Sequence, residues 1–321
     1  MVRPGGLILC GLLAPASVAA QGYYAENSGG YANYAYGSWS TVGGGGYNTV
    51  YYPYSTASGG WSNYIYSYSS TIAGGQSNSE YSYMGSIGGG YQVKAYLQYA
   101  TAIGGYQSLA ISYEGTVHGG ISNTIYYANQ ATIGGGDSNT VYDLNFGFVG
   151  GGSDNLVYGY ASTVGGGASN TAKSSSSDYM TIVGGNANFV SSYCATVGGG
   201  ATNKVTGKFG SINGGVSNTV GGYAGTVGGG SGGSATSYST VRGGKSNKAA
   251  SEPYATAFAG VSNLASAYAS VVSGGSSSTI VGNYGTVSGG LAHSVGGSYG
   301  AVNGGAYNTG SGVLDTISGG M

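Results

Sequence analysis

The sequence predicts an all-β protein: a parallel β-solenoid (β-roll) of about 20 coils with a mostly 15-residue repeat. A segment of the form small-Thr-Val/Ile-x-Gly-Gly-x-x-Asn returns along almost the whole chain, as in Ser162 to Asn170. Runs of about five residues rich in β-branched side chains alternate with Gly-rich corners. The 70 glycines disfavour long helices, because each costs roughly 0.5–1 kcal/mol relative to Ala inside a helix.

The repeat is counted from its Thr position. The starts are Glu26, Thr41, Thr56, Thr71, Ser86, Thr101, Thr116, Thr132, Phe148, Thr163, Thr181, Thr196, Ser211, Thr226, Thr240, Thr256, Val271, Thr286, Ala301 and Thr316. A glycine lies four residues after each of these 20 starts, and Asn lies seven residues after 14 of the 19 starts that extend that far. Because a disordered linker has no reason to keep such a phase, we expect an ordered chain.

The first predicted strand of each coil passes through the Thr position. Side chains alternate between the two faces of a strand. The small residue before Thr and the branched residue after it therefore face inward, as Ser162 and Val164 do, while Thr163 faces outward. The residue two positions before Thr, often Tyr, Trp or Phe, is expected to face outward too.

The Gly-Gly pair is predicted to form a corner that needs positive φ or brings stacked backbones too close for a Cβ. The following Asn is expected in a turn, because Asn tolerates left-handed conformations and its amide can bond the backbone or the next Asn in a ladder. The corner and turn residues singled out are Gly45, Gly60, Gly75, Gly167, Asn48, Asn63 and Asn170.

A second predicted strand places the residue nine after the start inward, as at Val50 and Ile65. Only about two branched apolar residues per coil then form the core, which is thin. We expect inter-coil hydrogen bonds to supply much of the cohesion and further burial between chains, so the first predicted partner is the chain itself, as a homo-oligomer or filament. At about 4.8 Å per coil the rod would be roughly 95 Å long. A loop is expected at Lys173 to Asp178, where the repeat lengthens.

Residues 1–20 resemble a secretory signal peptide, with Arg3, an apolar run and small residues before Gln21. Residues 21–321 are expected to form one solenoid domain that is secreted, extracellular or at the cell surface. The apolar run is too short to span a membrane. After residue 20 the sequence contains 7 basic and 9 acidic residues, so nucleic acid binding is not expected. It contains one cysteine, Cys194, so a disulfide framework is not expected either.

The pattern Tyr-Ala/Gly-Ser/Thr-Val-x-Gly-Gly, at a spacing of 14 to 16 residues, resembles the YadA-like head repeats of trimeric autotransporter adhesins, which are haemagglutinin-type β-roll repeats. The resemblance covers nearly all of residues 21–321. It implies a left-handed parallel β-roll, commonly a trimer, used in surface attachment. The sequence departs from that family in having no heptad stalk and no membrane-anchor barrel, so a free fibre or a secreted head is expected.

Tyrosine lies ten residues after the start in eight of the first nine repeats. We call these residues the tyrosine stripe: Tyr36, Tyr51, Tyr66, Tyr81, Tyr96, Tyr126, Tyr142 and Tyr158. A row of phenols combines apolar area with hydrogen-bonding tips, which suits binding of glycans or of a host or cell-surface protein. The alternative is a ladder that only stabilises the sheet by stacking. The sequence leaves both interpretations open.

Other chemistry is weakly supported. An ice-binding face would carry two Thr ranks per coil, and only one is present. Asp137, Asp143 and Asp154 lack a calcium-binding repeat, and the lone His118 and His293 make neither a triad nor a metal site. We therefore expect no enzyme activity, cofactor or metal. The sequence predicts a secreted structural or adhesive rod that self-associates into trimers or fibres. The alternatives are a carbohydrate-binding adhesin module acting without assembly, or an ice-binding protein.

Overall fold

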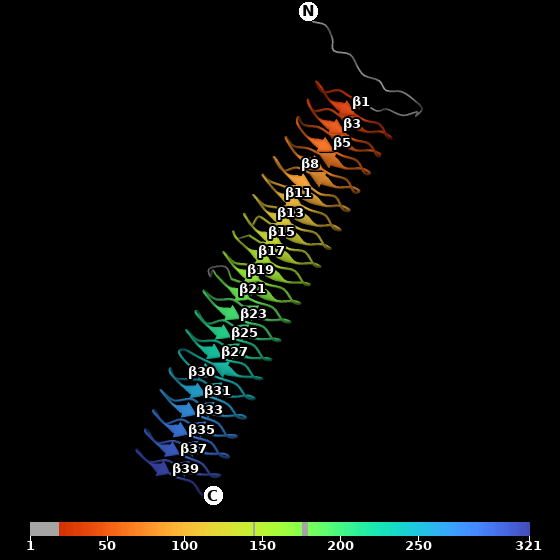
Figure 1. The fold of residues 1–321 in the computed structure, drawn as a ribbon. Helices are drawn as coiled ribbons and strands as arrows, with labels where there is room; N and C mark the ends of the chain where they lie inside the picture. The colour runs from red at the N-terminus through yellow and green to blue at the C-terminus, as the bar shows by residue number, and fades with distance from the viewer. Residues whose placement is uncertain (1–18, 144, 175–178) are drawn as a thin grey trace, which may run out of the picture.

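The computed structural model describes residues 19–143, 145–174 and 179–321. Throughout these ranges the chain is all-β, without a helix, and its 40 short strands are stacked in parallel as a β-solenoid of about 20 coils. The coils follow one another along a rod in sequence order, from the red N-terminal end to the blue C-terminal end (Figure 1). The predicted fold class is therefore confirmed.

The odd-numbered strands form one sheet, with one strand per coil. They are β1 (Ala19–Ala20), β3 (Tyr34–Ala35), β5 (Thr49–Val50), β7 (Tyr64–Ile65), β9 (Ser79–Glu80), β11 (Lys94–Tyr96), β13 (Leu109–Ile111), β15 (Thr124–Tyr126), β17 (Thr140–Tyr142), β19 (Leu156–Tyr158), β21 (Thr171–Lys173), β23 (Phe189–Val190), β25 (Lys204–Val205), β27 (Thr219–Val220), β29 (Ser234–Ala235), β31 (Lys248–Ala249), β33 (Leu264–Ala265), β35 (Thr279–Ile280), β37 (Ser294–Val295) and β39 (Thr309–Gly310).

The even-numbered strands contain the Thr position and form the second sheet. They are β2 (Glu26–Asn27), β4 (Thr41–Val42), β6 (Thr56–Ala57), β8 (Thr71–Ile72), β10 (Ser86–Ile87), β12 (Thr101–Ala102), β14 (Thr116–Val117), β16 (Thr132–Ile133), β18 (Phe148–Val149), β20 (Thr163–Val164), β22 (Thr181–Ile182), β24 (Thr196–Val197), β26 (Ser211–Ile212), β28 (Thr226–Val227), β30 (Thr240–Val241), β32 (Thr256–Ala257), β34 (Val271–Val272), β36 (Thr286–Val287), β38 (Ala301–Val302) and β40 (Thr316–Ile317).

Each strand contains only two or three residues, fewer than the five expected from the β-branched runs. Like residues pair between neighbouring coils, so that Thr41 lies opposite Thr56. This register survives the irregular repeats, because Thr163 still pairs with Thr181. Lys173, predicted to start a loop, instead lies in β21 opposite Tyr158. Residues 175–178 of the predicted loop lie outside the described residues.

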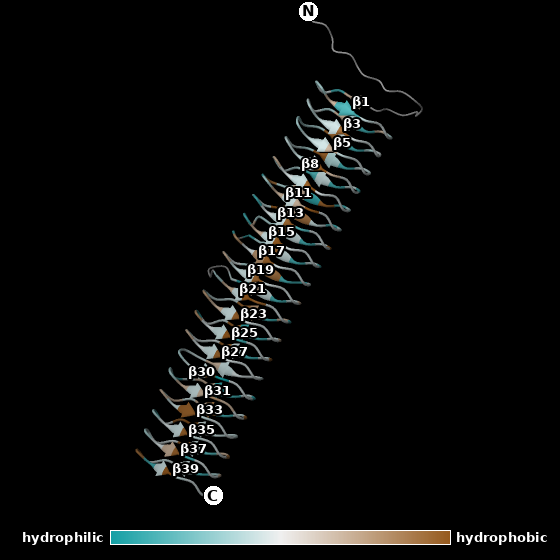
Figure 2. Cartoon of the chain, viewed as in Figure 1, coloured by the Kyte–Doolittle hydropathy of each residue, from teal (hydrophilic) through white to brown (hydrophobic). Residues whose placement is uncertain are grey.

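The core is a narrow strip enclosed between the two sheets. Val42 and Val50 are fully buried from opposite strands, and the small residue Ser40 before the Thr position is buried as well. The inward and outward faces are therefore those predicted from period-two alternation. Hydropathy alternates along the whole rod rather than collecting in one segment (Figure 2). Strand β1 overlaps the end of the expected signal segment, whose residues 1–18 lie outside the described ranges.

The corner glycines have the geometry that the repeat predicted. At Gly45, Gly60, Gly75 and Gly167 the φ angle lies between 79° and 91°. A Cβ on Gly60 would fall far inside van der Waals contact of the carbonyl oxygen of Gly75 in the next coil. Both reasons for glycine, left-handed backbone and close approach of stacked coils, therefore apply at the same position.

The Asn residues form a buried ladder along the inside of the corner. The Asn48 side chain donates to the carbonyls of Gly44 and Gly60, at 2.8 and 2.9 Å. Its Oδ1 accepts from the backbone and side-chain nitrogens of Asn63, at 3.0 and 3.1 Å. Asn170 likewise donates to the carbonyls of Gly166 and Gly185, and its backbone and side-chain nitrogens donate to the Oδ1 of the preceding Asn. The predicted amide ladder is therefore present, and all three Asn side chains are fully buried.

The left-handed conformation predicted for the Asn residues is wrong, because it belongs to the residue before each Asn. Tyr47 and Ser62 have φ of 57° and 55°, and Trp39 and Tyr54 at the opposite turn have φ of 60° and 59°. A left-handed conformation costs roughly 1–2 kcal/mol for a residue other than glycine. It turns the Ser62 N–H toward the carbonyl of Gly46 in the preceding coil, at 2.8 Å, whereas strand N–H groups donate to the following coil. Each coil is thus hydrogen-bonded in both directions.

Candidate functional site

The tyrosine stripe is a stack of rings beside the odd-numbered strands. Between adjacent coils the ring centroids are 4.6–5.5 Å apart and the ring planes lie within 20° of each other. Ile111 occupies the register position between Tyr96 and Tyr126 and divides the stack into groups of five and three rings. Beyond Tyr158 the stack is continued by the Lys173 ammonium, 5.8 Å from the ring centroid.

Stacking determines what the stripe can offer to a ligand. Within each group the interior rings lie face to face with their neighbours, so they present edges and hydroxyl groups outward rather than faces. Burial, followed by the hydrogen bond and the charge of Tyr51, raises the pKa of Tyr66 to about 12. Burial also raises the pKa of Tyr96. The stripe is therefore a neutral row of phenols that mainly contact one another.

A second set of rings runs along the turn that precedes the Thr position. It holds one ring per coil over eleven consecutive coils, and we call it the corner ladder: Phe146, Tyr160, Tyr179, Tyr193, Phe209, Tyr223, Tyr238, Tyr254, Tyr268, Tyr284 and Tyr299. Consecutive centroids are 4.9–6.1 Å apart. The stripe ends at Tyr158, where the corner ladder has already begun.

The ladder was missed in the sequence because its rings alternate between two positions. Some lie two residues before Thr, as Tyr179 does, and others three before, as Tyr193 does. Each position alone has gaps, such as Ala161 and Cys194. The signal was that a gap at one position is filled at the other, by Tyr160 and Tyr193.

The two aromatic rows differ in ring geometry. Seven of the ten contacts in the corner ladder are edge-to-face, with interplanar angles of 68–88°. In such a pair, the ring that contributes its edge keeps both of its faces outside the contact. Ten of the eleven rings are 36–55% exposed, whereas only four of the eight stripe rings reach 36% and none exceeds 41%. Crossed contacts therefore leave more ring face open along the corner ladder than parallel stacking leaves along the tyrosine stripe.

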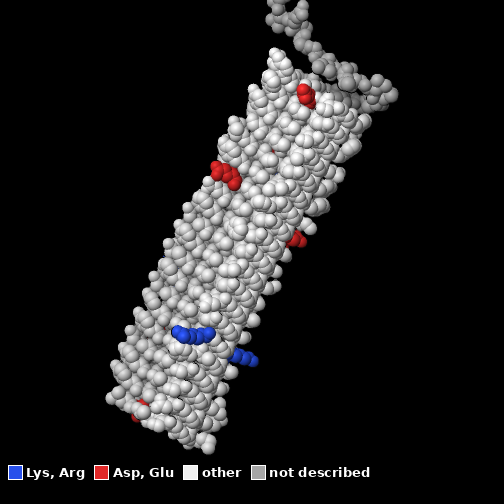
Figure 3. Space-filling model, viewed as in Figure 1, with Lys and Arg blue, Asp and Glu red and all other residues white. Residues whose placement is uncertain are grey.

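Charged side chains are few and scattered on the face of the rod that Figure 3 shows. In the described part of the chain no three His, Cys, Asp or Glu residues are grouped to hold a metal ion. Asp137 and Asp154 accept hydrogen bonds from neighbouring serines, at 2.7 and 2.8 Å. Cys194 is a free, half-buried thiol. Over the same residues, no helix is long and apolar enough to cross a membrane.

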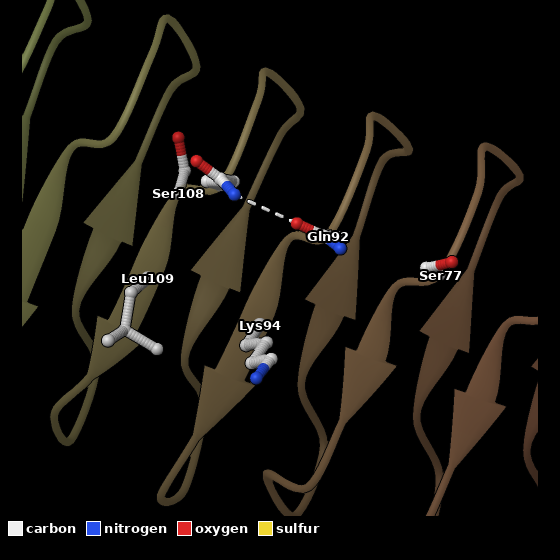
Figure 4. Close-up of a pocket in the computed structure, with 6 residues that line it drawn as sticks. Ser77, Gln92, Lys94, Ser108 and Leu109 are labelled. Carbon is white, nitrogen blue, oxygen red and sulfur yellow. Dashed lines mark hydrogen bonds between the residues drawn. The ribbon is translucent and has the colours of Figure 1, made fainter.

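A shallow depression of about 460 Å³ lies where the Asn ladder is interrupted at Val93 and Ser108 (Figure 4). Gln107 donates a side-chain hydrogen bond of 2.9 Å to Gln92 across its floor, and Lys94 extends beside it. The Ser108 hydroxyl is buried without a hydrogen-bond partner among the described residues. Leu109 also lines this depression, and none of its lining residues is aromatic.

His293 takes the place of an Asn in the ladder. It is buried, and its Nδ1 accepts a 3.3 Å hydrogen bond from the backbone nitrogen of Asn308, where an Asn oxygen would otherwise accept. Its role is therefore to continue the ladder.

Glu80 is a buried acid at an inward position of β9, which the sequence analysis did not single out. Its neighbours in register are Ile65 and Ala95. One carboxylate oxygen accepts hydrogen bonds from the backbone nitrogen and hydroxyl of Ser82, and the other has no partner in the described structure. Burial, opposed by the Ser82 hydrogen bonds, raises the pKa of Glu80 to about 8. The Glu80 side chain is fully buried, so we expect it to affect stability rather than surface chemistry.

Comparison with protein-family models and with curated proteins returns no match for this chain. The class of protein rests on the geometry alone: a parallel β-solenoid with two aromatic rows on its surface.

Proposed function

We propose that the protein is a secreted structural and adhesive component: a rod-like β-solenoid that self-associates into trimers or fibres and presents a Tyr- and Thr-rich surface. The observation that carries this proposal is the unbroken register of the coils, which makes a rigid rod whose surface bears few charges and long rows of exposed rings. Exposed apolar rows of this length are typical of interaction surfaces.

The thin core supports the association step. Each coil buries about two branched residues, such as Val42 and Val50, so burial between rods would add cohesion that a single chain lacks. The tyrosine stripe suits lateral contact, because its edges and hydroxyl groups form a straight neutral ridge. Outward Thr or Ser residues at 16 of the 20 starts provide hydroxyl groups along the second sheet.

Size measurement tests the proposal. The protein should be recovered from the medium of expressing cells with Gln21 at its N-terminus, and should sediment as trimers or larger species that appear as rods or fibres in electron micrographs. Changing Tyr51, Tyr66 and Tyr81 to Ser should shift the population toward monomer. A stable monomer at micromolar concentration for the unmodified protein would contradict self-association.

A carbohydrate-binding module acting without assembly is the second candidate function, and the exposed ring faces of the corner ladder favour it. A glycan array combined with size measurement distinguishes the two functions, because a module of this kind would bind glycans without ever assembling, whereas the structural component would form trimers or fibres. Ice binding has less support, since each coil contributes one outward Thr rank. A thermal hysteresis measurement with no effect would exclude it.

A further inference from the structure

We infer that the corner ladder, and not the tyrosine stripe, is a binding platform for a neutral linear polysaccharide lying along the rod axis. This inference depends on the proposed extracellular adhesive role, which would bring the chain into contact with such a ligand. Sugar rings pack against aromatic rings through the face of the aromatic ring, so only a row that exposes faces can take part. The tyrosine stripe and the corner ladder differ in how much ring face they expose.

In the tyrosine stripe, neighbouring faces are already used. Tyr66 lies between Tyr51 and Tyr81 at 4.6 and 4.9 Å, with interplanar angles of 15° and 2°. A sugar ring could reach such a phenol only at its edge. Since stacking also raises the cost of separating the rings, the stripe is suited to cohesion.

In the corner ladder, successive rings are crossed. Tyr179 makes contacts of 81° and 88° with Tyr160 and Tyr193, and Phe209 makes contacts of 82° and 68° with Tyr193 and Tyr223. Tyr179 and Phe209 are 50% and 45% exposed. Crossed rings that are half exposed leave face area for a ligand, and the same arrangement returns from Tyr254 to Tyr284.

The residues beside the rings favour a neutral, hydroxyl-bearing ligand. The turn residue paired with each ring is mostly small and uncharged, as at Ala161, Ala224 and Ser237, and Lys208 beside Phe209 is the charged exception among the described residues. In this half of the chain the position of the tyrosine stripe is mostly occupied by small residues instead: Ser191, Thr206, Gly221, Thr236, Ala250, Ser266, Val281, Gly296 and Ser311. A row of small side chains next to a row of rings lets a flat chain lie beside the rings.

A shallow depression of about 610 Å³ lies beside Tyr268 of the corner ladder. It is lined by Ser251, Glu252, Ser266, Ala267, Tyr268, Val281 and Asn283. The Asn283 side-chain oxygen accepts a 3.2 Å hydrogen bond from the backbone nitrogen of Tyr268, which leaves its amide nitrogen free of any hydrogen bond in the described structure. An aromatic ring, an amide, hydroxyl groups and the carboxylate of Glu252 therefore lie together here, and that carboxylate favours a neutral ligand over an anionic one.

Periodicity distinguishes a polysaccharide from a folded protein partner. Eleven rings spaced by about one strand separation, roughly 4.8 Å, make a straight row of about 50 Å. Protein interfaces concentrate affinity in a few deep central pockets, whereas this surface presents one ring in every coil, crossed with its neighbour in seven of the ten contacts. A ligand that is itself linear and repetitive can use all of these contacts.

The test measures depletion of the full-length secreted protein from solution by insoluble cellulose, chitin and mannan. The protein should bind at least one of them. The variant Phe146→Ser, Tyr179→Ser, Phe209→Ser, which removes three crossed rings, should bind at least about tenfold more weakly. The matched control Tyr51→Ser, Tyr66→Ser, Tyr81→Ser should bind normally. Serine occurs naturally at both kinds of position, at Ser69 and Ser191, which makes these changes compatible with the backbone.

Thermal unfolding followed by circular dichroism shows whether the variants fold, and the single changes Tyr179→Ser and Phe209→Ser replace the triple variant if it does not. The change Tyr179→Phe keeps the ring face and should keep binding. The inference is overturned if no polysaccharide binds, or if the stripe variant loses binding as strongly as the ladder variant. It is also overturned if the ladder variant abolishes self-association but not polysaccharide binding. Failure of the proposed self-association is recognised separately, because monomeric rods would still bind the polysaccharide.

Discussion

Replacing the buried acid Glu80 with Gln should change how the stability of the rod depends on pH. The folded protein holds the Glu80 proton up to about pH 8, whereas an unperturbed glutamate releases it near 4.5. Between these values the folded state binds more protons than the unfolded state, so the free energy of unfolding falls as pH rises. The difference between 4.5 and about 8, at about 1.4 kcal/mol per pKa unit, corresponds to roughly 5 kcal/mol.

Urea denaturation at several pH values measures this loss. The Glu80 contribution to the free energy of unfolding should be complete at about pH 4 and below, should fall by roughly 3 kcal/mol by about pH 7 and should be mostly lost by about pH 9. The Glu80→Gln variant, which cannot ionise, should show a much flatter profile. Because a repeat protein can open coil by coil, amide exchange of the strands around Ile65 and Ala95 provides a local measurement. Identical pH profiles for the two proteins would refute the reasoning.

Three further predictions concern the backbone and the stripe. Gly60→Ala should destabilise the rod by about 3 kcal/mol or more, because the new Cβ would collide with the Gly75 carbonyl. Gly59→Ala should cost less than about 1 kcal/mol, because no atom lies within 4 Å of the Cβ it would add. Chemical denaturation compares the two variants, and equal losses of stability would contradict the close approach of the coils. Ala224→Gly should stabilise the rod by about 1 kcal/mol in the same assay, because Ala224 has φ of 52°, and a loss of stability would argue against the left-handed turn. In an alkaline absorbance titration the Tyr66 phenol should ionise only near pH 12, so Tyr66→Phe should reduce the absorbance change at that end of the curve; an unchanged curve would contradict the burial of Tyr66.

The repeat in the sequence predicted most of the fold. The Thr and Gly columns gave the number of coils, and period-two alternation gave the inward residues, such as Val42 and Val50, because both depend only on the phase of a local pattern. The Asn ladder was predicted for the same reason. The positive φ of the residue before each Asn, such as Ser62, was not predicted, because a serine carries no local signal for a left-handed conformation.

The sequence also identified the tyrosine stripe, since its members occupy one column. It did not identify the corner ladder, whose rings alternate between two columns and come together only where the turn folds. Glu80 was overlooked because its acidic side chain departs from an apolar column, and its raised pKa follows from burial that only the closed coil provides.

The sequence by itself therefore determined the coil, its inward and outward faces and its corners, because every coil repeats the same local sequence pattern. The tertiary structure alone decided how side chains of different coils meet: face to face between Tyr66 and Tyr81, and edge to face between Tyr179 and Tyr193. These ring angles depend on contacts between residues one coil apart, and the residue type at a repeat position does not specify them. They decide which aromatic row presents ring faces to a ligand.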